Sequence, residues 1–153
     1  MKYKLFAVDR LQDILRLAIT MHGETDFKTV PFDVEQTANS VLNMVINNPR
    51  GHGVLAYTDD DQVAGMLCGG ISNYVFSRGS VANDYAFYVL PEHRGSWAAP
   101  RMIKMFSNWA RENGATELYI GISSGLFADR TGKLLERSGF DHVGGNYRKH
   151  LNA

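Results

Sequence analysis

The stretch Tyr88-Val-Leu-Pro-Glu-His-Arg-Gly-Ser-Trp-Ala-Ala-Pro100 decides the fold of this chain. It begins near the end of a nearly continuous apolar run, Val81 to Leu90, which is typical of a central strand covered on both faces. It ends at Pro100, which is placed like a first helical residue. The sequence therefore predicts a strand that leads, through a turn of small residues, into a helix.

This junction has the features of a phosphate-binding loop. The N-terminus of a helix presents backbone N–H groups without intrahelical partners, beside the positive end of the helix dipole. Arg94 adds a positive charge, and the side chains that follow it are small enough for a ligand to approach the main chain. They are Gly95, Ser96, Ala98 and Ala99. An ordinary strand-to-helix turn with a surface arginine fits the same spacing, so spacing alone leaves both interpretations open.

Apolar patterns on both sides of the loop indicate one mixed α/β domain over residues 1–153. Two apolar runs separated by the acidic turn Asp59-Asp60-Asp61 are typical of a β-hairpin. Helical spacing of apolar residues predicts helices that begin near residues 9, 33, 100 and 126. Asp9 with Gln12, and Asp33 with Gln36, have the spacing of a helix N-cap and its reciprocal partner, and helix stops are predicted at Gly23, Gly114 and Gly139. The predicted strands are residues 3–8, 52–58, 63–71, 81–90, 117–122, 140–145 and 147–151.

The composition limits the classes of partner. Lys plus Arg and Asp plus Glu number 16 each, so no overall charge attracts nucleic acid or an anionic membrane. Cys68 is the single cysteine, which excludes an internal disulfide framework and a multi-cysteine zinc site. Residues 1–10 lack the apolar run of a signal peptide or membrane span. We therefore expect a cytoplasmic protein with no metal, nucleic-acid or membrane partner.

The order of elements and the loop resemble a known family. Val-Leu-Pro-Glu-His-Arg-Gly followed by a helix looks like the GNAT N-acetyltransferases, whose loop reads Gln/Arg-x-x-Gly-x-Gly/Ala, and the match covers nearly the whole chain. Arg94 falls on the first motif position and Ala99 on the last. Trp97 stands where the family usually has its middle glycine, so its ring must turn aside, onto the adenine or into the sheet. The loop and the segment Met21–Thr25 resemble in particular phage-related and bacterial members.

The resemblance implies the GNAT fold, a mixed, mostly antiparallel sheet of six to seven strands with helices on both faces. It also implies acetyl-CoA (coenzyme A) as the cofactor, with a small-molecule or peptide amine as acceptor and a homodimer as an open alternative. Main-chain groups of Phe87, Tyr88 and Val89 would pair with the pantetheine arm where two parallel strands splay apart, and an N–H among them would polarise the thioester carbonyl. The residues implied around the diphosphate are Arg94, Gly95, Ser96, Trp97, Ala98 and Ala99.

The sequence departs from the family at the proton-transfer positions. The strand position of a glutamate base falls on Asn83, and the helix position of an acid tyrosine falls on Leu135. Asn83 and its neighbour Asp84 cannot both point into one site unless a bulge intervenes. The replacement candidates for catalysis are Asp84, Tyr88, Glu24 and His22, with Tyr119 and Tyr147 as further tyrosines. For each tyrosine the sequence favours a half-buried aromatic on a sheet over a catalytic role, whereas for His22 and Glu24 a solvated loop and a catalytic role fit equally well.

Two other functions compete with acetyl transfer. Gly121-Ile-Ser-Ser-Gly125 matches the Gly-x-Ser-x-Gly nucleophile elbow of serine hydrolases between a predicted strand and helix, although it explains nothing before Glu117. A module that binds acyl-CoA or another protein without turnover would account for Trp97, Asn83 and Leu135. The sequence favours an acetyl-CoA-dependent N-acetyltransferase that moves acetyl directly to a primary amine.

Overall fold

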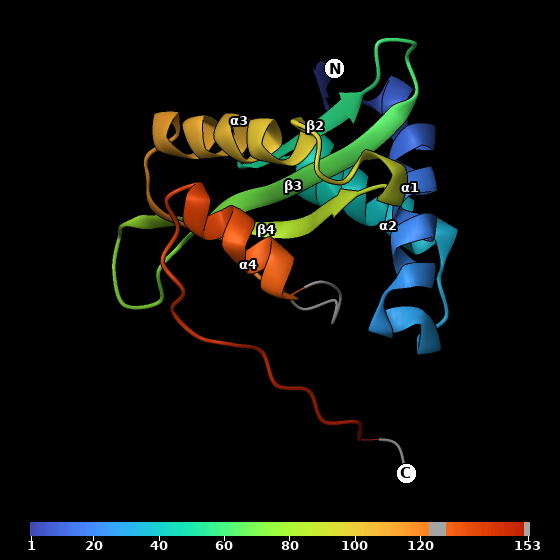
Figure 1. Ribbon diagram of the computed structural model, residues 1–153. Helices are drawn as coiled ribbons and strands as arrows, with labels where there is room; N and C mark the ends of the chain where they lie inside the picture. Colours follow the sequence, from blue (N-terminus) through green and yellow to red (C-terminus); the bar gives the residue numbers. More distant parts are fainter. Residues whose placement is uncertain (123–127, 152–153) are drawn as a thin grey trace.

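A five-stranded mixed sheet forms the centre of the fold (Figure 1). The computed structural model describes residues 1–122 and 128–151. The strands are β1 (Lys2–Leu5), β2 (Gly51–Tyr57), β3 (Val63–Asn73), β4 (Ser80–Val89) and β5 (Ala115–Tyr119). They lie in chain order across the sheet; the first three pairings are antiparallel, and β4 pairs with β5 in parallel. The predicted mixed, mostly antiparallel sheet is confirmed.

The prediction of two further strands at the end of the chain is wrong. Residues 140–151 form no strand and follow the last helix as an irregular segment (Figure 1). The Asn146 side-chain amide donates to the Ile122 carbonyl at 3.2 Å, and Arg148 lies 3.6 Å from the carboxylate of Asp26. The apolar side chains of the segment, Val143, Tyr147 and Leu151, are exposed. Alternation of apolar and polar residues shows which side chains share a face, but a strand also needs a neighbouring edge to pair with. The sheet therefore has five strands among the described residues instead of six to seven.

Helices cover both faces of the sheet, as predicted. They are α1 (Leu11–Glu24), α2 (Val34–Val41), α3 (Ala98–Glu112) and α4 (Ala128–Arg137), and α2 continues into a π-helical turn, η3 (Leu42–Ile46). Side chains of α1 and η3 pack on one face of the sheet, and those of α3 and α4 pack on the other. None of the helices in the described ranges has the length and apolar character needed to span a bilayer.

The helix ends follow the local sequence in most places. Asp33 caps α2, because its Oδ1 accepts a hydrogen bond from the Gln36 N–H at 2.9 Å. Gly114 and Gly139 follow α3 and α4 with positive φ values of 86° and 92°. The predicted cap and stop of α1 are wrong: the helix begins after a short 3-10 turn without a side-chain cap and continues through Gly23.

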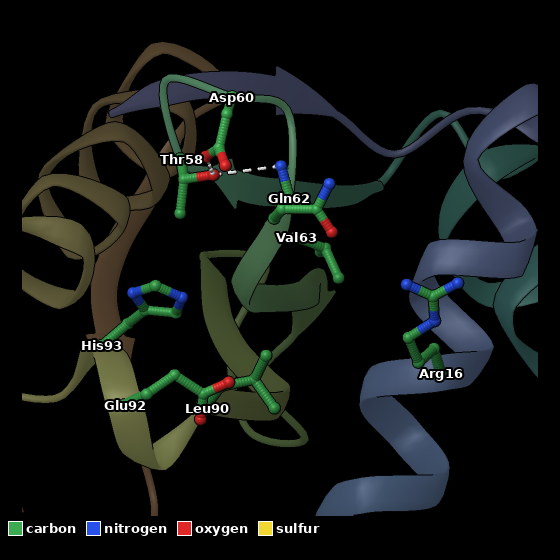
Figure 2. Close-up of a pocket in the computed structure, with 8 residues that line it drawn as sticks. All are labelled: Arg16, Thr58, Asp60, Gln62, Val63, Leu90, Glu92 and His93. Atoms are coloured by element: carbon green, nitrogen blue, oxygen red, sulfur yellow. Dashed lines mark hydrogen bonds between the residues drawn. The ribbon is translucent and has the colours of Figure 1, made fainter.

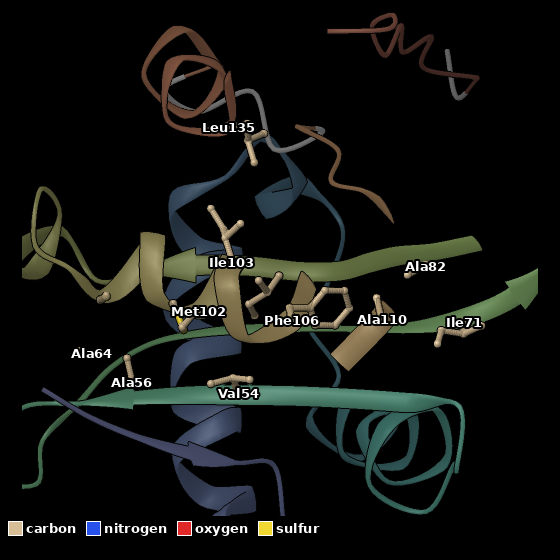
Figure 3. Packing of buried hydrophobic residues seen from close by; sticks show 12 residues of the cluster. Val54, Ala56, Ala64, Ile71, Ala82, Met102, Ile103, Phe106, Ala110 and Leu135 are labelled. Atoms are coloured by element: carbon tan, nitrogen blue, oxygen red, sulfur yellow. The ribbon is translucent and has the colours of Figure 1, made fainter. Parts of the chain in front are cut away.

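The core beneath α3 fixes the position of that helix on the sheet (Figure 3). Phe106 and Met102 are fully buried there, together with Leu67 of β3. Phe106 lies directly over Gly69, where an added Cβ would come within 2.8 Å of the ring. On the opposite face Cys68 is buried, and burial raises the pKa of its thiol to about 12, so it packs as a small apolar side chain.

Replacing Phe106 by alanine should lower the free energy of unfolding by about 3–5 kcal/mol, because a fully buried ring leaves a cavity. The measurement is urea denaturation followed by circular dichroism. Tyr147→Ala is the control, since this side chain is 98% exposed, and it should change stability by less than about 0.5 kcal/mol. Equal denaturation midpoints for the two variants would contradict this account of the core.

Candidate functional site

Strands β4 and β5 part halfway along β4. Their parallel pairing runs from Ser80, opposite Ala115, to Asn83, opposite Tyr119. Beyond Asn83, β4 continues to Val89 and stays paired with β3 alone among the described residues. After Asn83, the edge of β4 that faces β5 is therefore unpaired among the described residues. This is the separation of two parallel strands that the resemblance implies.

The open edge presents the main chain of alternate β4 residues. The N–H of Leu90 donates to the carbonyl of Ala64 on β3 at 2.9 Å. Because successive residues of an antiparallel strand direct their backbone groups to opposite sides, Tyr88 faces β3, while Phe87 and Val89 face the open edge. Of the three residues expected to pair with pantetheine, the strand geometry thus favours Phe87 and Val89.

A carboxyl group lies where the two strands separate. The pairing of β4 with β3 shifts between Cys68 and Gly69, which leaves Tyr85 as an extra, bulged residue. Just before the bulge, Asp84 accepts a hydrogen bond from the Gly121 N–H at 2.9 Å, in the segment that follows β5. Burial raises the pKa of the Asp84 carboxyl, which brings it closer to neutral pH.

The loop between β4 and α3 leaves main-chain donors at the start of a helix of 15 residues. Gly95 has a φ of 85°, which turns the chain into the helix and which a residue with a side chain would rarely adopt. The hydroxyl of Ser96 caps the N–H of Ala98 at 3.2 Å. The N–H groups of Gly95, Trp97 and Ala99 make no hydrogen bond within the described part of the chain. These donors suit a diphosphate.

The ring of Trp97 does not block the start of α3. It is 80% exposed, so the expectation that it could turn into the sheet is wrong. The Trp97 carbonyl instead accepts a hydrogen bond from the Tyr3 hydroxyl at 3.3 Å. The ring lines a surface hollow of about 570 Å³ together with Tyr3, Arg101 and Lys104.

Three of the predicted site residues contact one another. The guanidinium of Arg94 donates to both carboxylate oxygens of Glu24 at 2.7 and 2.9 Å, and its Nε donates to the Val89 carbonyl at 3.0 Å. The hydroxyl of Tyr88 also donates to Glu24. Hydrogen bonding to Arg94 lowers the pKa of Glu24, whereas burial and the bond to Glu24 raise the pKa of Tyr88. Nothing in the spacing of residues this far apart in sequence predicts their contact.

The other candidates lie apart from this cluster. His22 Nε2 is 2.6 Å from the carbonyl of Val30, and its ring packs against Phe32. Leu135 is buried in the core under α3. Ser123 and Ser124 of the elbow motif lie outside the described residues. Among the described residues no group of His, Cys, Asp and Glu side chains could hold a metal ion.

A second hollow, of about 410 Å³, lies between α1, the turn from β2 to β3 and the residues that follow β4 (Figure 2). Arg16 approaches it from α1, opposite Glu92 and His93. Its lining includes no residue of β5, so it does not open onto the gap between β4 and β5. The candidate site is therefore the open edge of β4 together with the start of α3.

Known proteins resemble this chain in sequence pattern and in fold. The model of a family described as the acetyltransferase (GNAT) family matches residues 11–140. The structure is similar to aminoglycoside antibiotic 6'-N-acetyltransferase AAC(6')-Ih from Acinetobacter baumannii, with a TM-score of 0.76, 22% identity, and coverage of 99% of this chain and 98% of that one. A search of curated proteins finds no match.

Two further solved structures share the fold. AAC(6')-Iy in complex with the bisubstrate analogue CoA-S-monomethyl-acetylneamine has a TM-score of 0.73 and 18% identity, with 98% of each chain covered. Ribosomal-protein-alanine N-acetyltransferase from Brucella melitensis biovar Abortus 2308 has a TM-score of 0.71 and 13% identity, with 99% of this chain and 100% of that one covered. At these identities the likeness establishes the fold alone.

Replacing Glu24 by glutamine should reduce stability at neutral pH, because Arg94 loses its counter-ion in a partly buried place. Arg94 holds the pKa of Glu24 below its unfolded value, so the contribution of the carboxylate is present above the unfolded pKa and is lost as the pH falls through the folded pKa. The difference between wild type and variant should shrink between about pH 5 and about pH 3, measured by urea denaturation. A difference that stays constant over this range would contradict the assignment.

Proposed function

Because the chain belongs to the acetyltransferase (GNAT) family, we propose that it is an acetyl-CoA-dependent N-acetyltransferase that moves an acetyl group directly to a primary amine. The observation that carries the proposal is the open edge of β4 beside the start of α3. A main-chain edge next to unused helix donors suits a ligand that joins a diphosphate to an extended amide arm. The lone thiol, Cys68, is buried, so we propose direct transfer without an acyl-enzyme, in a reducing compartment such as the cytoplasm.

The residues present fit coenzyme A along its length. The N–H groups of Gly95, Trp97 and Ala99 would hold the diphosphate, and the main chain of Phe87 and Val89 would pair with the pantetheine arm. When bound, acetyl-CoA supplies an acetyl group activated as a thioester. An N–H of the open edge would stabilise the negative charge that develops on the carbonyl oxygen. The carbonyl of Val89 is already engaged by Arg94, so Phe87 offers the more complete pair of groups.

Asp84 is the residue that we assign to proton transfer. An amine must lose its proton before it can attack a carbonyl, and a base works best with a pKa near the working pH. Asp84 lies where the strands separate, and burial raises its pKa toward that range. It would accept the proton of the ammonium directly or through one water. Its neighbour Asn83 is exposed and has no group that takes a proton.

The remaining candidates have other contacts. Glu24 is held ionised by Arg94, and the Tyr88 proton is donated to Glu24, so neither is free to serve the amine or the departing thiolate. The His22 ring is bound to the Val30 carbonyl. We therefore assign Asp84 alone among the four candidates to the chemical step.

We propose a small-molecule amine as the acceptor. The support is similarity in fold to the aminoglycoside antibiotic 6'-N-acetyltransferase AAC(6')-Ih and to AAC(6')-Iy, which is in complex with CoA-S-monomethyl-acetylneamine. The ribosomal-protein-alanine N-acetyltransferase shows that the same fold also occurs in a protein named for a peptide acceptor. An acceptor screen should therefore contain aminoglycosides, simple primary amines and a peptide with an N-terminal alanine.

A binder without turnover is the second candidate function. It is favoured by one observation: Leu135, a buried apolar side chain, occupies the position where the family often has an acid. Such a protein would bind coenzyme A through the same loop and would release no thiol with any amine. Binding and turnover must therefore be measured separately.

Acetyl-CoA and coenzyme A should each raise the melting temperature, because ligand at about 100 times its Kd stabilises the folded state by about 2.7 kcal/mol. A nucleotide without the pantetheine arm should have a smaller effect. Release of free thiol with the amine panel then separates enzyme from silent binder. If neither form of coenzyme A shifts the melting temperature, the proposed function is wrong.

Asp84→Asn should lower kcat/KM by about 10²- to 10⁴-fold, the usual contribution of a general base. Asparagine keeps an oxygen that can accept from Gly121, so the Kd for coenzyme A should not change. The acid limb of the wild-type pH–rate profile, which comes from protonation of Asp84, should be lost from the residual rate. Asn83→Ala is the matched control and should retain activity. An unchanged rate for Asp84→Asn would exclude it as the base.

A further inference from the structure

An ion pair between Glu24 and Arg94 links the end of α1 to the loop before α3. Glu24 is the last residue of α1, and Arg94 lies in the loop before α3. Both carboxylate oxygens accept from the guanidinium, Oε1 from Nη1 at 2.7 Å and Oε2 from Nη2 at 2.9 Å. The side chains are 25% and 19% exposed, so solvent screens the pair only in part. This bidentate contact therefore restrains the loop relative to α1.

Two further contacts fix the plane of the guanidinium. Its Nε donates to the Val89 carbonyl at 3.0 Å, at the open edge of β4. Its Cζ lies 5.5 Å from the ring centre of Tyr88, whose hydroxyl donates to the same carboxylate of Glu24. Turning Arg94 toward a ligand would break the bidentate contact and leave Glu24 without its counter-ion. The side chain of Arg94 is thus held between α1 and the end of β4.

We propose that Glu24 is a positioning residue, which acts through Arg94 to hold the loop between β4 and α3 in the conformation that binds the diphosphate of coenzyme A. The inference rests on the proposed function. It identifies the residue that fixes the conformation of the loop that binds coenzyme A. The charge of Arg94 is matched by the carboxylate, so the loop binds through its main-chain N–H groups. The path of the chain from Val89 to Gly95, which leads to those groups, depends on a side chain of α1.

A double-mutant cycle on the Kd for coenzyme A, measured by calorimetry, tests this dependence without knowledge of the acceptor. Glu24→Gln and Arg94→Gln should each weaken binding about tenfold or more, as expected for loss of a charged hydrogen bond. The double variant should bind no more weakly than the weaker single variant, because both changes remove the same contact. Arg94→Lys should also weaken binding, since a lysine cannot contact Glu24 and Val89 together.

Other roles for these residues give different results. If Arg94 contacted the diphosphate directly, Arg94→Gln would weaken binding while Glu24→Gln left it unchanged or tighter, and the proposal would be overturned. If Glu24 were the base, Glu24→Gln would lower kcat at an unchanged Kd, with the same consequence. A wild-type protein that does not bind coenzyme A would overturn the proposed function as well. Wild-type binding with unaffected variants would overturn this inference alone.

Controls separate positioning from loss of fold. Asp61→Asn removes the exposed ion pair with Lys2, whose atoms are 2.9 Å apart, and should leave the Kd unchanged. Thermal melts followed by circular dichroism identify any variant that is not folded. If Glu24→Gln does not fold, Glu24→Asp replaces it, because it keeps the charge and shortens the reach. The proposal then requires weaker binding by Glu24→Asp, and unchanged binding would overturn it.

Discussion

The candidate site depends on the point at which β4 stops pairing with β5. After Asn83 the backbone of β4 is held by β3 alone within the described chain, and the groups of Phe87 and Val89 face an open edge. The core under Phe106 holds α3 against the sheet, and the helix begins just beyond the end of β4. The unpaired edge of β4 therefore lies next to the start of α3. One interrupted pairing thus brings together an extended main-chain edge and a helix N-terminus.

Much of the fold could be predicted because its signals are local. The hairpin of β2 and β3, the Asp33 cap and the glycine stops after α3 and α4 depend on a few neighbouring residues. The alternating pattern at the end of the chain predicts two strands, but in the described residues this segment pairs with no strand, although the outer edge of β5 is unpaired. The spacing of Asp9 and Gln12 predicts a capping motif at the start of α1, yet no side-chain cap forms there.

In the candidate site, too, local features could be predicted from the sequence and long-range contacts could not. The loop around Gly95 was identified because its turn and its small residues are adjacent in sequence. The bulge at Tyr85 and the contact of Asp84 with Gly121 depend on how two strands pair, which a single strand's sequence does not reveal. The pairing of Glu24 with Arg94 joins residues from opposite halves of the chain. Residue types indicate the candidates, and the contacts in the structure are the basis for the separate roles that we propose for them.

The free N–H groups at the start of α3 belong to the main chain, which every residue type except proline can supply. A tryptophan in place of the family's usual glycine removes no donor there, since its ring projects into solvent. Evolution can therefore replace side chains around such a loop while its path is kept.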